Sequence, residues 1–215
     1  VPLQVYNTLQ IAAERERLCR TDILIIGGGA IDAGLEAEIR QLPGKVYSTY
    51  GMTETLSHIA LRRLNGPDAS TLYYPFPSVR LSLSPEHTLI IDAPLVCDTI
   101  LVTNDVAEIN SDGSFSILGR KDNTINTGGI KVQAEQVEDI LRPWIHVPFA
   151  ITSVSDAALG EAIVLLIENG GYTERLEEKM KELLTKYQLP KMVFSVGTIP
   201  LTETGKINRA GCRQL

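Results

Sequence analysis

The sequence predicts an α/β fold in two parts: a larger part with a parallel sheet and a small antiparallel subdomain, then a small α+β domain. Three observations predict it. Residues 22–49 follow the order strand, glycine turn, helix, strand, which is typical of a parallel sheet. Residues 79–118 contain short strands and the hairpin signal Ser111-Asp112-Gly113. After residues 119–122 the pattern of helices and strands begins again, so we expect the domain boundary there.

In the larger part, apolar residues at helical spacing predict a helix over residues 3–20. Residues 22–26 are almost entirely apolar, which predicts a strand buried on both faces. A helix over 32–41, capped by Asp32, and a strand over 45–49 should follow. Beyond a loop at 65–77, four short strands are expected, at 79–83, 88–92, 106–110 and 114–118.

The first domain is expected to occupy residues 1–120 and the second residues 121–215. In the second, proline terminates both expected helices, because proline disfavours helical geometry in the residue before it. The expected elements are a helix over 133–141, strands over 149–154 and 162–167, an amphipathic helix over 173–187 and a strand over 192–196.

Composition excludes several classes of function. A net charge of −6 over 215 residues argues against a nucleic-acid surface and against a basic membrane-binding face. No apolar run reaches the ~18 residues that span a bilayer, and no signal peptide opens the chain. The three cysteines and three histidines lack ligand spacing, so we expect a reducing compartment and no protein-built metal cage. Because the chain starts at Val1, we expect it to be a piece of a longer protein.

A glycine turn, Gly27-Gly28-Gly29, follows the first strand. It does not fit the dinucleotide fingerprint, because the third glycine of that pattern would fall at Asp32 and residues 45–49 contain no acid to hold a ribose. The turn either permits strand–helix packing or lets a flat ligand approach the backbone, since glycine has no side chain to block it.

The segment Tyr50-Gly51-Met52-Thr53-Glu54 follows the second strand, where a loop in a parallel sheet faces a ligand. An aromatic ring can stack on a purine, a hydroxyl can donate to a phosphate, and a carboxylate can hold Mg²⁺. The alternative is a plain turn in which Thr53 caps a short helix.

Further along, Asp105 of Thr103-Asn104-Asp105 offers two coplanar acceptors for a diol. The chain also contains Gly119-Arg120-Lys121-Asp122, Asn126-Thr127-Gly128-Gly129-Ile130-Lys131 and, near its end, Gly205-Lys206. The last pair does not belong to a phosphate loop, because Pro200 and Ile207 occupy the positions that need a glycine and a hydroxyl. Taken singly, Asp105 could be a surface turn residue, residues 119–122 could be a solvated charged loop, and Lys206 could be a solvated lysine.

Together and in this order, the motifs resemble the adenylate-forming superfamily of acyl-CoA synthetases and adenylation domains. The resemblance implies that Gly28 and Gly29 lie against adenine and that the Tyr50–Glu54 motif contacts purine, phosphate and Mg²⁺. It further implies that Asp105 holds the ribose, although Asn104 replaces the usual glycine, and that Arg120 reaches ribose or phosphate. Asp122 would be the hinge, Gly128 and Gly129 would line the pantetheine tunnel, and Lys206 would stabilise the adenylation transition state, with Thr53 also catalytic.

The resemblance therefore implies an acid–thiol ligase that uses ATP, Mg²⁺ and CoA to convert a carboxylic acid into its CoA thioester in the cytoplasm, and it admits a homodimer. The short interval between Glu54 and Asp105 is similar to that in the o-succinylbenzoate–CoA ligases of menaquinone biosynthesis. Another acyl-CoA ligase or a peptide-synthetase-type adenylation domain is the alternative. The family's phosphate loop is absent from these residues, so we expect no adenylation by this chain alone; an inactive nucleotide- or CoA-binding fragment is the alternative of another class.

Overall fold

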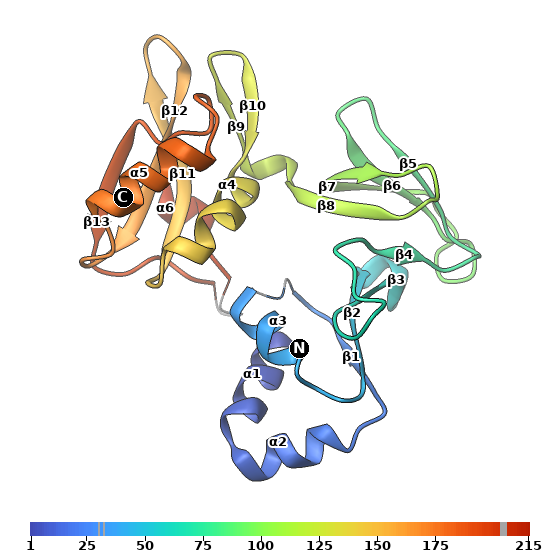
Figure 1. The fold of residues 1–215 in the computed structure, drawn as a ribbon. Helices are drawn as coiled ribbons and strands as arrows, with labels where there is room; N and C mark the ends of the chain where they lie inside the picture. The colour runs from blue at the N-terminus through green and yellow to red at the C-terminus, as the bar shows by residue number, and fades with distance from the viewer. Residues whose placement is uncertain (30, 32, 203–205) are drawn as a thin grey trace. The chain divides into compact units, whose positions relative to one another are not determined.

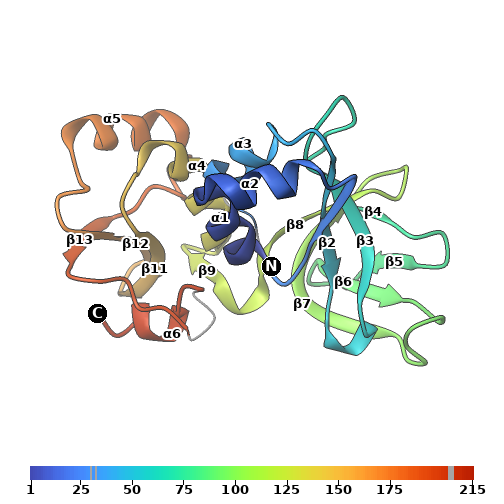
Figure 2. The same ribbon diagram turned by 90° about the horizontal axis from the view of Figure 1, so that it is seen from below.

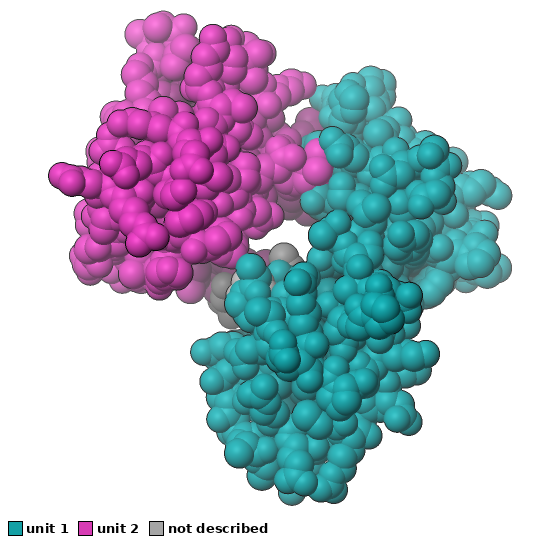
Figure 3. All heavy atoms as spheres, viewed as in Figure 1, with its two compact units in different colours: residues 1–117 teal, residues 118–215 magenta. Residues whose placement is uncertain are grey.

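The structure, a computed structural model, describes residues 1–29, 31, 33–202 and 206–215. The chain divides into two compact units, residues 1–117 and 118–215 (Figure 3). This division falls a few residues before the boundary that the sequence suggests. Each unit has hydrophobic clusters of its own.

Unit 1 begins with two helices, α1 (Pro2–Gln10) and α2 (Ala12–Cys19), where the sequence predicts one. Ile11 between them has an extended backbone, with φ −108° and ψ 112°. The physical reason is that Val5 and Leu9 of α1 are buried in the core, whereas α2 buries no residue. The apolar stripe therefore does not continue along one straight helix.

The first sheet has the order β1-β2-β3-β4 (Figure 1). Strands β1 (Ile23–Ile26) and β2 (Lys45–Gly51) are parallel, as predicted, and α3 (Ala33–Ile39) connects them. Asp32, the predicted cap of that helix, lies outside the described residues. The antiparallel strands β3 (His58–Arg63) and β4 (Tyr74–Pro75) extend the sheet and were not predicted.

Strand β1 is not buried on both faces, so that prediction was wrong. Ile26 is buried against α1 and α3, but Ile23 and Ile25, on the opposite face, are 56% and 50% exposed. The reason is that α1 and α3 pack on the face that carries Ile26, which leaves the face of Ile23 and Ile25 exposed in this chain.

A second sheet, which lies in unit 1 except for the last three residues of β8, has the order β5-β6-β7-β8 and forms the predicted antiparallel subdomain. Its strands are β5 (Arg80–Leu83), β6 (Thr88–Asp92), β7 (Leu101–Ile109) and β8 (Phe115–Arg120). The predicted hairpin turn is confirmed: Gly113 has φ +83°, and the Asp112 carboxylate accepts from the backbone N–H of Ser114 at 3.0 Å. Hydrogen bonds from Ser114 lower the pKa of Asp112.

Unit 2 contains a five-stranded sheet in which β13 pairs with β12 beside the path β10-β9-β12-β11. The strands are β9 (Thr124–Thr127), β10 (Ile130–Gln133), β11 (Phe149–Asp156), β12 (Gly160–Glu168) and β13 (Met192–Val196). The helices are η2 (Lys121–Asn123), α4 (Ala134–Leu141), η3 (Arg142–Trp144), α5 (Glu174–Leu183) and α6 (Arg209–Cys212). Helix α5 ends before the predicted residue 187 because Leu184 is extended.

Both faces of this sheet are covered. Ile163, Leu165 and Ile167 of β12 pack with residues of α4 and α5, whereas Val164 and Leu166, which alternate with them, pack with Cys212 of α6. Figure 2 shows α4 and α5 on one side of β11 and β12 and α6 on the other. Burial raises the pKa of the Cys212 thiol. Among the described residues, none of the helices has the length and apolar character needed to cross a bilayer.

Candidate active site

The turn after β2 projects two of the predicted site residues outward. Strand β2 ends at Gly51, and the 3-10 helix η1 (Thr53–Thr55) leads back to β3. The buried Thr55 fixes this turn, because its hydroxyl accepts from the N–H of Met52 at 3.1 Å and donates to the carbonyl of Ser57 at 2.7 Å. Thr53 and Glu54 are exposed. Thr55 was not among the predicted site residues, although its hydroxyl holds the turn. The signal in the sequence is a threonine three residues after Met52, which directly follows the end of β2.

Gly51 has a packing role that is independent of any ligand. A Cβ atom on Gly51 would lie 2.7 Å from Cα of His58 and closer still to the carbonyl oxygen of Ser57. The register between β2 and β3 shifts at Tyr50/Gly51, which is where the two backbones come this close. Gly51 is therefore required by the fold of the turn.

We predict that Gly51→Ala destabilises the chain by about 1–3 kcal/mol, the usual range for overpacking a tight site. Urea unfolding followed by circular dichroism measures this. Gly197→Ala is the matched control, since a Cβ there meets nothing within 4 Å. Equal midpoints for the two variants would contradict the packing role.

Tyr50 and Asp105, which the sequence places 55 residues apart, are joined by a hydrogen bond. The Tyr50 hydroxyl donates to Oδ2 of Asp105 at 2.6 Å. The Tyr50 ring packs edge-on against Phe115, with centroids 5.4 Å apart, and lies 5.9 Å from the ring of Tyr73. These contacts hold the ring and the carboxylate in one orientation at the carboxyl end of β2.

An irregularity in β7 places Asp105 at this position. Thr88 of β6 pairs with Val106 and Ile90 pairs with Val102, so residues 103–105 stand opposite one residue of β6. Such bulges redirect side chains and are frequent beside active sites. Within the bulge, the N–H of Asp105 donates to Oγ1 of Thr103 at 3.1 Å. Asn104 does not adopt positive φ, so the usual glycine is not needed for this backbone.

The glycine turn after β1 also has a packing reason. A Cβ on Gly27 would lie 2.7 Å from Oγ1 of Thr49 on β2, and Gly28 has φ +86°. Gly28 and Gly29 follow the carboxyl end of β1, at the same end of the parallel pair as Tyr50. A role in binding adenine stays a prediction for both.

Glu54 is the predicted Mg²⁺ ligand, and its chemistry fits that ion. It supplies exposed hard oxygen atoms beside the Thr53 hydroxyl, and Mg²⁺ in nucleotide sites is usually held by one or two carboxylates together with phosphates. In the part of the chain that the structure describes, no group of three or more His, Cys, Asp or Glu side chains could hold a metal.

Arg120, predicted to contact ribose or phosphate, and Asp122, the predicted hinge, lie at the beginning of unit 2. Arg120 ends β8, Asp122 lies in η2, and their side chains, both more than half exposed, form an ion pair at 3.5 Å. The carbonyl of Asp122 accepts from Arg213 at 3.2 Å. The hinge role of Asp122 stays a prediction.

Gly128 and Gly129 form the two-residue turn of a β-hairpin that was not predicted. They connect β9 to β10, with Thr127 paired to Ile130. Their φ angles are +59° and +82°, the geometry of the type I′ turns that favour glycine. The turn is exposed. Hairpin geometry therefore accounts for both glycines, and contact with pantetheine stays a prediction.

Lys206 lies beside a short antiparallel pairing near the C-terminus. Its N–H donates to Oγ1 of Thr202 at 3.1 Å, and Leu201 pairs with Ile207. Gly205 lies outside the described residues. Lys206 is exposed, and no described residue forms an ion pair with its ammonium group.

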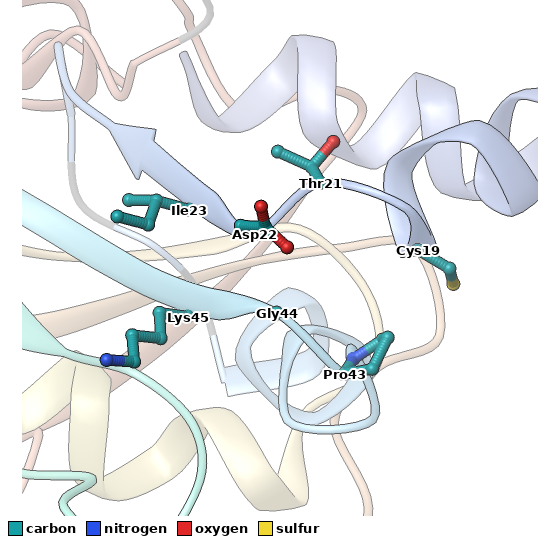
Figure 4. Close-up of a pocket in the computed structure, with 7 residues that line it drawn as sticks. All are labelled: Cys19, Thr21, Asp22, Ile23, Pro43, Gly44 and Lys45. Atoms are coloured by element: carbon teal, nitrogen blue, oxygen red, sulfur yellow. The ribbon is translucent and has the colours of Figure 1, made fainter.

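Figure 4 shows an open pocket of about 400 Å³ in unit 1, lined by Cys19, Thr21, Asp22, Ile23, Pro43, Gly44 and Lys45. It lies where β1 and β2 begin, at the opposite end of these strands from Gly28 and Tyr50. Ligands of parallel sheets bind beyond the carboxyl ends of the strands. This pocket is therefore separate from the candidate active site.

No family model matches the chain. Among curated proteins, it is 26% identical over 204 residues to a 2-succinylbenzoate–CoA ligase of Lactococcus lactis, covering 87% of this chain and 45% of that protein. It is 32% identical over 120 residues to the vibriobactin-specific 2,3-dihydroxybenzoate-AMP ligase of Vibrio cholerae, covering 53% of this chain and 22% of that protein. The chain thus spans less than half the length of these relatives.

Among solved structures, the chain is 32% identical to an acyl-CoA synthetase (AMP-forming)/AMP-acid ligase II-like protein of Dyadobacter fermentans, with a TM-score of 0.58 over 98% of this chain and 62% of that one. The o-succinylbenzoate–CoA synthetase of Bacillus subtilis, solved with ATP and magnesium ion, has the same fold, with a TM-score of 0.71 at 19% identity over 98% of this chain and 54% of that one. In sequence and structure, the chain is therefore similar to the C-terminal part of adenylate-forming acyl-CoA synthetases and ligases.

Proposed function

We propose that the chain forms the C-terminal part of an ATP-dependent acyl-CoA ligase. The observation that carries the proposal is the hydrogen bond between Tyr50 and Asp105. It joins a group suited to stack on a purine with a group suited to bind a ribose diol, beside a turn that exposes Thr53 and Glu54. Purine, ribose, phosphate and Mg²⁺ are the parts of Mg·ATP.

In the first half-reaction, a carboxylate oxygen attacks the α-phosphorus of ATP, and the bond to the β-phosphate breaks to release pyrophosphate and leave an acyl-adenylate. Gly28, Gly29 and Tyr50 contact adenine, Asp105 accepts from the ribose hydroxyls, and Arg120 contacts ribose or phosphate. Thr53 donates to a phosphate and Glu54 holds Mg²⁺. Lys206 stabilises the negative charge where the two anions meet, because a cation fixed at developing charge lowers the barrier.

In the second half-reaction, the CoA sulfur attacks the acyl carbonyl, AMP leaves and a thioester forms. Unit 2 pivots near Asp122 between the two steps, so that Lys206 withdraws and the Gly128-Gly129 turn meets the pantetheine arm. A hinge suits this chemistry because one pocket must accept two different partners in turn.

The proposed acid is o-succinylbenzoate, which would place the enzyme in menaquinone biosynthesis. The match to a 2-succinylbenzoate–CoA ligase over 87% of the chain supports this choice. The match to an aryl-AMP ligase over 53% of the chain favours the second candidate, another acyl-CoA ligase or a peptide-synthetase-type adenylation domain. Cys19, Cys97 and Cys212 are free thiols, as suits an enzyme of the cytoplasm.

Acid-dependent ATP–pyrophosphate exchange by the intact enzyme, over a panel of acids, tests the proposal. We expect exchange with o-succinylbenzoate and none with amino or fatty acids. Exchange with an amino acid, a fatty acid or a different aryl acid instead would select the second candidate. Calorimetry with AMP and with CoA on the 215-residue chain separates a binding unit from an inert fragment.

A further inference from the structure

Two charged residues of unit 2, a buried glutamate and a partly buried arginine, form a bidentate ion pair. Glu138 of α4 is 2% exposed. Its Oε1 accepts from Nη1 of Arg209 at 2.5 Å, and its Oε2 accepts from Nη2 at 2.8 Å. This parallel geometry is the strongest arrangement for arginine and carboxylate. Burial acts against the charged form of Arg209, but hydrogen bonds and charge from Glu138 outweigh it and raise the pKa of Arg209.

The pair forms hydrogen bonds with the backbone of an edge strand of the sheet. Strand β11 is an edge strand that pairs with β12, and Ile151 lies in its middle. The N–H of Ile151 donates to Oε1 of Glu138 at 2.7 Å, and its carbonyl accepts from Arg209 at 3.0 Å. Helix α4 packs on one face of the sheet and α6 on the other (Figure 2). Glu138 and Arg209 therefore connect both layers around the edge.

Stability alone is a weak explanation for such a pair. The buried Glu138 and the partly buried Arg209 lose much of their hydration, and well-packed apolar residues often replace a buried ion pair at no loss of stability. What the pair adds is one defined position of α6, because a bidentate contact constrains both distance and orientation.

A short segment with several backbone hydrogen bonds connects the start of α6 to Lys206. Arg209 is the first residue of α6, and Asn208 caps the helix by accepting from the N–H of Gly211 at 3.0 Å. Asn208 also donates its own N–H to the carbonyl of Pro200 at 2.8 Å. The pairing of Leu201 with Ile207 continues this connection to the residue next to Lys206.

We propose that Glu138 and Arg209 are positioning residues for Lys206. The inference rests on the proposed function, because it assigns the pair a role in the adenylation half-reaction. It requires that a change in the pair alters where Lys206 lies and leaves the rest of unit 2 folded.

The first test uses two variants of the pair. Arg209→Lys keeps the charge but removes the bidentate contact, and the double variant Glu138→Leu with Arg209→Met replaces the pair by apolar residues, which also removes the two hydrogen bonds to the backbone of Ile151. We expect each to slow adenylation by about 10-fold or more, since displacement by about 1 Å costs up to about 10²-fold. Thioester formation from supplied acyl-adenylate should not change. Arg175→Lys on α5 is the matched control.

The second test separates positioning from general damage. In a Lys206→Ala background, Arg209→Lys should cause no further loss of adenylation, because the group it positions is gone. In the 215-residue chain, amide exchange at Thr202, Lys206 and Asn208 should accelerate in Arg209→Lys, with Leu165 unchanged.

Unchanged exchange at these amides, equal loss of both half-reactions, or additive losses in the Lys206→Ala background would overturn the inference. Full adenylation activity of Lys206→Ala would instead refute the proposed role of Lys206. Amide exchange distinguishes these failures, because it reports how firmly the hydrogen bonds of the segment are held without requiring activity.

Discussion

Lys206→Ala in the intact enzyme is expected to lower the rate of adenylation by a factor on the order of 10²–10³ and to leave thioester formation from supplied acyl-adenylate unchanged. The size follows from losing one preorganised group that stabilises charge in the transition state. The selectivity follows because no pyrophosphate departs in the second half-reaction. Lys206 is exposed, and its ammonium has no ion-pair partner among the described residues, so its removal should not disturb the fold.

ATP–pyrophosphate exchange measures the first half-reaction, and release of AMP from acyl-adenylate with CoA measures the second. Lys186→Ala, at another exposed lysine of unit 2, is the matched control. A comparable loss of both rates in Lys206→Ala would contradict a role confined to adenylation and, with it, the pivot of unit 2.

Asp105→Ala is expected to weaken AMP binding by about 10²-fold or more. The carboxylate would accept hydrogen bonds from two ribose hydroxyls, and hydrogen bonds to charged groups contribute about 1.5–3 kcal/mol each. Tyr50→Phe should have a smaller effect, about 10-fold or less, because it removes one hydrogen bond that orients Asp105 and keeps the ring.

Titration calorimetry measures the affinity of the Asp105→Ala and Tyr50→Phe variants for AMP. Asp98→Ala, at an exposed aspartate in the loop before β7, is the control for loss of one negative charge. If Asp105→Ala binds AMP as tightly as the unchanged chain, the ribose role is wrong. If Tyr50→Phe loses more affinity than Asp105→Ala, the hydroxyl of Tyr50 contacts the nucleotide itself.

Some elements could be predicted because their signals are local. The parallel pair β1–β2 follows from a strand, a glycine turn and a helix, and the turn at Gly113 follows from its Asp-Gly step. The β9–β10 hairpin had an equally local signal, two glycines between extended residues, but the family resemblance assigned Gly128 and Gly129 to a ligand loop. Strand β3 lacked such a signal, because an irregular turn held by the buried Thr55 connects it to β2.

The sequence by itself determined which chemical groups are present and in what order: an aromatic, a hydroxyl and a carboxylate after β2, an aspartate in β7, glycines at turns and a lysine near the end. Only the tertiary structure decided which of them meet. Tyr50 reaches Asp105 because the register shifts in both β2–β3 and β6–β7, and Glu138 reaches Arg209 because two helices on opposite faces meet at one sheet edge. Contacts between residues 55 and 71 positions apart depend on how strands pair and bulge, and neither is encoded in the pattern of a single segment.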